Sequence, residues 1–262
     1  MAKKLYDLSP SLTTTSGAVM WPKLAPDVVH TQGPFSRGVS RANTPSWPLS
    51  WRTGVGFVGH MHGGTHVDAP IYCIDGGVAI EKVPLENLYG TGVVVDMRYL
   101  KKWDKITAED FEKAKPSIQE GDFVVVNTGW QRFYGQEQNY VYYHHYPGLV
   151  PTAAEWLIKK KVKAVAGTWP TCDHSLAFAP LQHWLPHLLR EYKKEIGKDP
   201  GEEFPSFEPC LTKLIENGIS CIQNAGGDID QVTGQRCILA AFPFVVERAD
   251  AGMVRLVAIF KK

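Results

Sequence analysis

The chain has 262 residues, 44% of them hydrophobic, which suits one large α/β domain or two small ones. Its 28 basic and 27 acidic residues give a net charge of +1, so the composition argues against nucleic-acid or membrane-surface binding. No apolar run reaches about 18 residues and the first six residues carry no apolar signal region, so we expect neither a transmembrane helix nor a signal peptide. Five scattered cysteines without a C-x-x-C pair indicate reduced thiols and a cytoplasmic protein.

The N-terminal region begins with a short strand-like segment, Tyr6–Ser9. Residues 10–54 are rich in Pro, Ser, Thr and Gly, which predicts a long ordered loop region, and long loops in compact domains are often functional. Three tryptophans in this region either pack on the sheet or line a pocket, and they are Trp21, Trp47 and Trp51.

The stretch GHMHGGTHVDAP, residues 59–70, places three imidazoles and a carboxylate close together. Alternate residues of an extended segment share one face, so we expect these four side chains to point the same way. They belong to His60, His62, His66 and Asp68. The Gly-Gly pair before Thr65 lets the backbone bend, and the strand should stop at the proline that ends the stretch.

Imidazole nitrogen and carboxylate oxygen form a ligand set that suits Zn²⁺, Mn²⁺ or Fe²⁺. The alternative is a strand with ordinary surface histidines. Four such residues, all at even-numbered positions and next to a Gly-Gly pair that can bend the chain, favour the metal site.

Beyond this stretch, apolar runs alternate with helix signals, a rhythm that predicts an α/β fold. Two helices should start at capping boxes, Thr107 with Asp110 and Thr152 with Glu155. The predicted strands are residues 93–96, 123–127, 162–167, 219–223, 237–246 and 254–260.

Residues 176–208 interrupt the rhythm with a helical excursion. Apolar residues fall at helical spacing between Leu181 and Tyr192, and Pro186 should kink that helix or mark its first turn. A further helix is predicted from about Pro209 to Asn217.

The segment His62–Pro70 resembles the H-x-G-T-H-x-D-x-P-x-H signature of the metal-dependent cyclase family, which includes bacterial kynurenine formamidase and isatin hydrolase. Three further segments resemble other parts of the family pattern, and they are Gly121–Trp130, Gly218–Asp228 and Arg255–Ile259. The resemblance implies the family's swivelling β/β/α domain, a mixed sheet with flanking helices, as a single domain over residues 1–262. It also implies a homodimer or a larger homo-oligomer.

By this resemblance, His62, His66 and Asp68 hold one divalent metal ion, with zinc or manganese expected. The family pattern then has a histidine as general acid/base where this chain has Tyr72. An imidazole titrates near pH 6.5 and a phenol near pH 10, so a phenol shuttles protons poorly at neutral pH. It can still donate a hydrogen bond to an oxyanion.

Binuclear relatives complete a second metal site with a histidine and a glutamate, which by resemblance fall at Leu211 and Gln223. Leucine cannot bind a metal and neutral glutamine is a poor ligand, so we expect a single-metal site. Gln223 either contacts a metal-bound water or the substrate, or is a buried glutamine satisfied by the backbone.

Other histidines have competing interpretations. His60 is an accessory ligand or orients His62. His174, with Asp173, is expected near a strand end and is a candidate catalytic residue. The pair His183 and His187 has metal-binding helical spacing, but an aromatic packing face explains it as well.

The leading hypothesis is a metal-dependent hydrolase of a small molecule, a formamide, cyclic amide or lactone of aromatic character, acting through metal-activated water. The first alternative is a non-hydrolytic cyclase, lyase or isomerase that uses an enolate, with Tyr72 as proton donor. The second is a catalytically silent ligand-binding member. The candidate catalytic residues are Tyr72, His60, Gln223 and His174.

Overall fold

The structure is a computed structural model that describes residues 3–11, 27–32, 53–58, 60–135, 138–177 and 185–261. The predicted loop region lies largely outside these residues, as do Trp21, Trp47, Trp51 and His183. Two described segments of that region, β2 (Asp27–Gln32) and β3 (Thr53–Val58), pair in a two-stranded antiparallel sheet.

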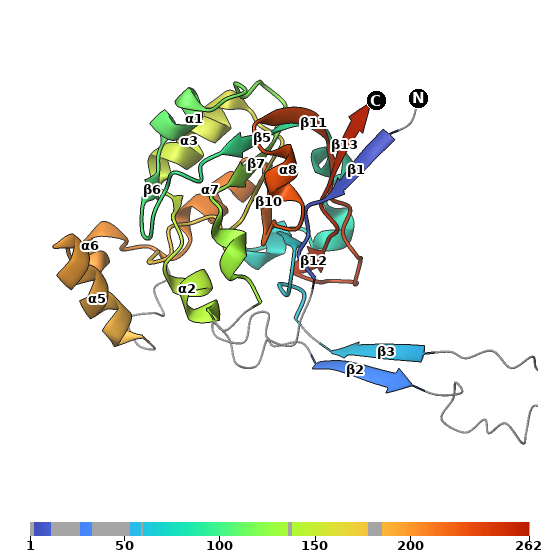
Figure 1. Cartoon of the computed structure of the whole chain (residues 1–262), viewed down its shortest axis with the longest axis horizontal. Helices are drawn as coiled ribbons and strands as arrows, with labels where there is room; N and C mark the ends of the chain where they lie inside the picture. The colour runs from blue at the N-terminus through green and yellow to red at the C-terminus, as the bar shows by residue number, and fades with distance from the viewer. Residues whose placement is uncertain are drawn as a thin grey trace, which may run out of the picture.

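A mixed sheet forms the centre of the described chain (Figure 1). In spatial order its nine strands are β1 (Lys3–Asp7), β13 (Val257–Lys261), β11 (Gln235–Ala240), β5 (Tyr89–Asp96), β7 (Phe123–Asn127), β9 (Ala164–Gly167), β10 (Ser220–Gln223), β4 (His66–Asp68) and β12 (Ala251–Met253). The four central strands, β5, β7, β9 and β10, run parallel, and the outer pairs are antiparallel. The predicted α/β mixed sheet with flanking helices is confirmed.

Alternation along the central strands divides the apolar side chains between two cores. Val124 and Val126 of β7 face the core beneath α1 (Ala108–Lys113), α3 (Pro151–Lys160) and α7 (Pro209–Glu216). Phe123 and Val125 face the core shared with β1, β11, β13 and α8 (Ile229–Val232). Figure 1 shows α1 and α3 to the left of β5 and β7, with α8 to their right. Burial on both faces explains why β7 reads as a continuous apolar run.

One of the two predicted helix caps is found in the structure, and the other is not. As predicted, the Asp110 carboxylate accepts a hydrogen bond from the backbone N–H of Thr107 at 2.8 Å, just before α1. The prediction that Thr152 caps the next helix is wrong, because α3 begins at Pro151 with Val150 at its cap. Proline fits the first turn of a helix, where its missing N–H removes no hydrogen bond.

Strand ends near the C-terminus also differ from the prediction. The strand expected over residues 237–246 ends at Ala240, and the strand expected over 254–260 begins only at Val257, as β13, with β12 as a separate short strand before it. Pro243 lacks an N–H for a ladder, and it makes only an isolated bridge to Val254.

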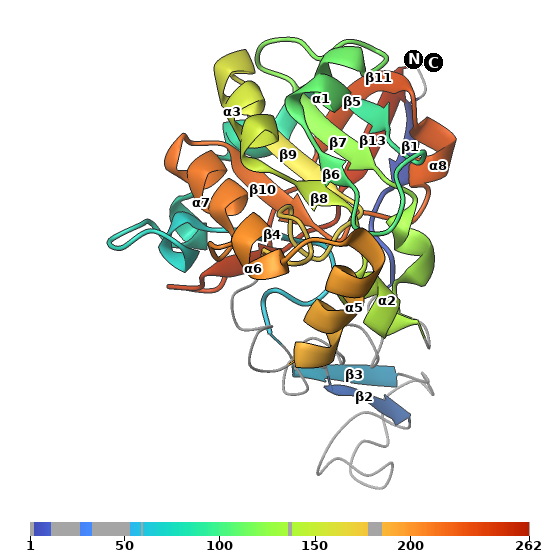
Figure 2. The same ribbon diagram turned by 90° about the vertical axis from the view of Figure 1, so that its left-hand side faces the viewer.

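Within residues 176–208 the described chain forms α5 (Pro186–Ile196) and α6 (Pro200–Glu203), with Pro186 in the first turn of α5. These helices lie below α1 and α3 in both views (Figures 1 and 2). Leu188, Tyr192 and Phe204 pack with Trp103 in a small core of their own. The single-domain organisation remains a prediction.

Shorter elements complete the described chain. They are β6 (Lys105–Ile106), which pairs in parallel with β8 (Gly148–Leu149), the helix α2 (Asn139–His144), and the 3-10 helices η2 (Pro70–Tyr72), η3 (Ile80–Lys82), η4 (Leu85–Leu88) and η5 (Trp130–Phe133). All the described helices are too short or too polar to span a bilayer.

Candidate metal centre

The histidine-rich stretch is a turn followed by a short strand. Only His66–Asp68 forms β4, and the residues before it bend, so the prediction of one extended face through His60 and His62 is wrong. The N–H of Gly63 donates to the His60 carbonyl at 2.9 Å, and Gly64 has a positive φ of 69°. The turn, and not strand alternation, therefore carries the His62 ring to the β4 side chains.

Strand β4 holds the other two candidate ligands rigidly. It pairs with β10 on one side and β12 on the other, with His66 opposite Gln223 and Asp68 opposite Ala251. Val67 belongs to the apolar core on one face of the sheet. His66 and Asp68 face the other way, and they are only 3% and 4% exposed.

These side chains converge closely enough to hold one ion. Ligand atoms of His62, His66 and Asp68 all lie within 4.8 Å of one another. Asp68 Oδ1 is 3.0 Å from His62 Nδ1 and 3.3 Å from His66 Nε2. Apart from these ionic contacts and one between His62 and Asp250, three buried atoms here make no hydrogen bond within the described chain, and they are His62 Nε2, Asp68 Oδ1 and Gln223 Oε1. Orphaned donor atoms of this kind fit a divalent cation.

Neighbouring groups fix the orientation of the candidate ligands. His66 Nδ1 lies 2.9 Å from the Gly64 carbonyl, which can only accept, so Nδ1 carries the hydrogen and Nε2 is left for a metal. The same carbonyl accepts a hydrogen bond from the Asn224 side chain at 2.7 Å. Gln223 Nε2 donates to Asp68 Oδ2 at 2.9 Å, which leaves Oδ1 toward the two imidazoles.

The electrostatics of the site favour a cation. Burial alone lowers the pKa of His62, but the carboxylates of Asp250 and Asp68 raise this pKa to about 10. Burial acts to raise the pKa of Asp68, but His66 and His62 hold it well below its usual range. Asp250 Oδ2 lies 3.3 Å from His62 Nε2. Two carboxylates beside His62 therefore draw either a proton or a metal ion to this position.

A cavity of about 600 Å³ opens over the three candidate ligands, a size that suits a small organic molecule. One part of its wall is polar, with Thr171, Glu208, Thr212, Gln223, Asn224 and Asp250. Another part offers Tyr143, Pro170, Phe207 and Leu211. Among the described lining residues there is no lysine or arginine.

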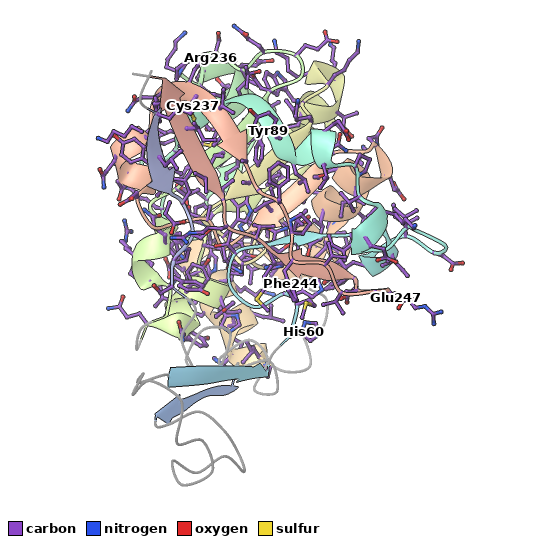
Figure 3. All side chains as sticks on the ribbon, turned by 90° about the vertical axis from the view of Figure 1, so that its right-hand side faces the viewer. His60, Tyr89, Arg236, Cys237, Phe244 and Glu247 are labelled. Atoms are coloured by element: carbon purple, nitrogen blue, oxygen red, sulfur yellow. The ribbon has the colours of Figure 1, made fainter. Side chains whose placement is uncertain are left out.

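Three of the four predicted catalytic residues lie at this cavity. Tyr72, at the end of η2, lies against His62 with the rings tilted by 48° and their centroids 4.6 Å apart, and its hydroxyl donates to Glu208 Oε2 at 3.1 Å. Gln223 is 1% exposed and is bonded to Asp68. His60 is exposed at the edge of the folded body (Figure 3), with its ring 5.0 Å from that of His62.

The fourth predicted residue, His174, lies elsewhere. It is 1% exposed, its Nε2 lies 2.9 Å from the Trp103 carbonyl, and its ring stacks on Phe204 at 4.0 Å. Burial lowers its pKa to about 4. His174 is not among the described residues that line the cavity, and packing accounts for its position. Its neighbour Asp173 accepts the N–H groups of Cys210 and Leu211 at the start of α7.

The position expected for a second-metal histidine holds an apolar side chain. Leu211 lines the cavity as an apolar side chain, 1% exposed, on α7. Within the described residues, the cluster of His62, His66 and Asp68 is the one group of three side chains close enough to share an ion. His187 instead lies with its Nε2 2.9 Å from the Tyr140 hydroxyl.

Sequence reasoning missed two carboxylates of the site, Glu208 and Asp250. Glu208 directly precedes α7 and is 4% exposed, and Asp250 directly precedes β12. Both residues lie in segments far along the chain from the histidine stretch. Only the folded chain brings these segments close to β4. An acidic residue before a helix proline usually indicates a cap, so the sequence around Glu208 carries no catalytic signal.

A mixed α/β sheet with a His-His-Asp cluster on and beside its penultimate strand defines the general class, an α/β protein with a candidate metal centre. The sequence model described as "Putative cyclase" matches residues 6–174, more than half of the chain. The chain therefore belongs to the cyclase family, and the resemblance drawn from the histidine stretch is confirmed.

Individual relatives are distant. An isatin hydrolase of Roseibium aggregatum is 24% identical over 218 residues, which cover 77% of this chain and 72% of that protein. A solved isatin hydrolase bound to the product analogue thioisatinate has a TM-score of 0.73 and 20% identity, covering 99% of this chain and 93% of the other. A predicted metal-dependent hydrolase from Bacillus stearothermophilus has a TM-score of 0.67 and 20% identity, covering 100% of both chains. At these identities, the solved structures establish the shared fold.

Proposed function

We propose that this protein is a metal-dependent hydrolase that opens an amide, cyclic amide or lactone of a small molecule, with one divalent ion held by His62, His66 and Asp68. The observation that carries the proposal is the convergence of three ligand atoms within 4.8 Å at the base of a 600 Å³ cavity. The isatin hydrolase relative and the fold shared with a structure that binds thioisatinate support a cyclic amide as the first substrate to test.

A divalent ion bound here supplies Lewis acidity and lowers the pKa of water from about 15.7 toward about 7. The chain's own residues position that chemistry. Gln223 holds Asp68 through Oδ2, and His66 is fixed by the Gly64 carbonyl. Burial and the carboxylates of Glu208 and Asp68 raise the pKa of Tyr72 well above 10, so its hydroxyl stays protonated and donates its hydrogen bond to Glu208 Oε2.

The substrate we propose is uncharged. Asp68, Glu208 and Asp250 line the cavity, and its described lining contains no lysine or arginine to receive a carboxylate or phosphate. Tyr143 and Phe207 offer aromatic faces to a ring.

A second candidate is a cyclase, lyase or isomerase that passes through an enolate. The protonated Tyr72 hydroxyl favours it, because a neutral phenol is suited to donate a proton to a strong base.

Three further features are also proposals. Nitrogen and oxygen ligands support zinc or manganese. Exposed Phe242, Phe244 and Val245 support a homodimer or larger homo-oligomer. The five free cysteines support a cytoplasmic location.

The test uses purified full-length protein loaded with Zn²⁺ or Mn²⁺ and three probes, isatin, an aryl formamide and an aryl lactone. Hydrolysis that requires the metal, is lost in His66→Ala and persists in His187→Ala supports the proposal. Conversion of a probe without gain of water supports the second candidate. A metal-loaded protein that converts none of them contradicts the hydrolase proposal and favours a silent ligand-binding member.

A further inference from the structure

Glu208 is a buried carboxylate that faces the proposed reaction cavity. It is 4% exposed and lines the cavity together with the candidate metal ligands. Its Oε2 accepts a hydrogen bond from the Tyr72 hydroxyl at 3.1 Å. Tyr72 in turn lies against the His62 ring. Glu208 is therefore connected through Tyr72 to His62, one of the candidate metal ligands.

Helix capping does not explain this side chain. Glu208 occupies the position before α7, yet its side chain makes no capping hydrogen bond. The first free N–H groups of α7, those of Cys210 and Leu211, donate to Asp173 at 2.7 and 2.8 Å. Because Asp173 caps the helix, the Glu208 carboxylate is free to turn into the cavity.

The backbone of Glu208 is strained. Its φ of 40° and ψ of 52° lie in the left-handed region, which a residue with a long side chain rarely adopts. Two backbone hydrogen bonds hold it there, from its N–H to the Ala177 carbonyl at 2.9 Å and from the Thr212 N–H to its carbonyl at 3.1 Å. Strain that the surrounding structure maintains is found most often at functional sites.

The groups around Glu208 suit proton exchange near neutral pH. Burial, with the nearby carboxylates of Asp173 and Asp68, raises the pKa of Glu208 to about 7, while the hydroxyls of Thr171 and Tyr72 oppose this rise. Tyr146 is a further titratable neighbour, and its phenol stays protonated because burial raises its pKa. A group with a pKa near the working pH is the most effective general acid or base.

We propose that Glu208 is the proton-transfer residue of this site, an inference that rests on the proposed hydrolase function. Its carboxylate takes a proton from the attacking water as the new C–O bond forms. The resulting carboxylic acid then gives that proton to the leaving nitrogen or oxygen as the C–N or C–O bond breaks. The proton is conserved over the cycle, and no oxidant or reductant takes part. Tyr72 is a positioning residue, because its hydrogen bond fixes Oε2.

His60 is the rival for this role, because imidazole also exchanges protons near neutral pH. It is exposed, its ring centroid lies 5.0 Å from that of His62, and its Nδ1 accepts a hydrogen bond from the His62 N–H at 3.4 Å. Burial and the neighbouring His62 lower its pKa. Glu208 is enclosed and linked to Tyr72, so the structure favours the carboxylate.

The test compares Glu208→Gln with the wild-type protein, with Glu216→Gln as a matched control at the exposed end of the same helix. Metal content by elemental analysis, kcat, KM and the pH dependence of kcat/KM are measured with the probe hydrolysed best. We expect Glu208→Gln to keep its metal and KM, to lose about 100-fold or more in kcat, and to lose the pH limb near 7. Glu216→Gln should match the wild type.

Retention of the rate and of the pH limb in Glu208→Gln overturns the inference, as does loss of that limb in His60→Gln instead. Infrared difference spectra, wild type minus Glu208→Gln, give a readout that needs no substrate. We expect a carboxylic-acid C=O band that disappears as the pH rises through about 7, and absence of that band overturns the inference. Failure of the hydrolase proposal itself gives a different result. The wild-type protein then binds no metal or hydrolyses none of the probes, and this is seen before any Glu208 variant is compared.

Discussion

At the scale of single residues, the site depends on how two carboxylates are held. Asp68 directs Oδ1 toward both imidazoles because Gln223 occupies Oδ2. Glu208 has Oε2 occupied by Tyr72. The resemblance to the family signature predicted His62, His66 and Asp68 as ligands, and the structure brings these three side chains together. The sequence could not identify Glu208, because its position at the cavity depends on the path of the chain into α7.

Removal of the Tyr72 hydroxyl tests its positioning role. Tyr72→Phe should lower kcat/KM about 100-fold, because Glu208 loses the hydrogen bond that positions Oε2 and a misplaced reacting group costs about that much. The pH limb should also move upward, because the Tyr72 hydrogen bond helps to hold down the pKa of Glu208. Metal content should not change. Tyr99→Phe is the control, since Tyr99 donates to Asp110 on the surface. Full activity in Tyr72→Phe would assign Tyr72 to packing alone.

The raised pKa of Glu208 also predicts how stability depends on pH. The folded protein holds this proton up to about pH 7, while the unfolded chain loses it near the ordinary pKa of 4.5. Ionisation of the buried carboxylate therefore destabilises the folded state as the pH rises from 4.5 through 7. In metal-free protein, Glu208→Gln should have a free energy of unfolding that matches wild type at pH 4 and exceeds it by about 1–3 kcal/mol at pH 8.

Urea unfolding in EDTA at both pH values measures this difference, with Glu216→Gln as the control. Asp173, whose pKa burial raises to about 6, is present in both proteins and contributes with the same sign. Equal stability of wild type and Glu208→Gln at pH 8 would mean that the carboxylate is not destabilised by its surroundings.

At the scale of elements, a short strand and a glycine turn together build the centre. Strand β7 was predicted with its observed bounds, Phe123–Asn127, because a strand buried on both faces is a continuous apolar run. The turn before β4 was not predicted as such. Sequence alternation alone cannot distinguish a strand from a turn, and the bend at Gly64 is fixed by Asn224, a residue 160 positions away.

Gly64→Ala should weaken metal binding. Alanine at a φ of 69° costs about 1–2 kcal/mol, and relief of this strain shifts the carbonyl that holds His66 Nδ1. Loss of such a supporting contact typically lowers metal affinity about 10- to 100-fold. Titration with Zn²⁺ against a competing chelator measures the change. Gly197→Ala, with a φ of 78° at the end of α5, is the matched control, and an equal loss in that variant would contradict the role assigned to the Gly64 carbonyl.

At the scale of the whole molecule, the candidate centre lies where the sheet brings distant segments together. Strand β4 lies between β10 and β12, so the metal ligands are adjacent to residues 223 and 250. The sequence pattern predicted the α/β class and most central strands. It could not predict the strand order, because that order depends on pairing between segments far apart in the chain.

Metal binding should therefore stabilise the whole fold. An ion at 100 to 1,000 times its dissociation constant adds about 2.7–4.1 kcal/mol to the free energy of unfolding. For a chain of this size, that raises Tm by about 5–15 °C. Thermal unfolding with Zn²⁺ or Mn²⁺ against EDTA measures the shift. Asp68→Asn should show almost none, and a full shift in that variant would locate the stabilising ion elsewhere.

The most direct test of a mononuclear metal centre is the metal stoichiometry of the purified full-length protein, measured by elemental analysis. His62, His66 and Asp68 converge on one position, and Leu211 adds no ligand, so we expect about one Zn or Mn ion per chain. His66→Ala and Asp68→Ala should each lose it, while Leu211→Ala should retain it. Two tightly bound ions per chain, or one ion that survives in both His66→Ala and Asp68→Ala, would contradict a mononuclear centre at this site.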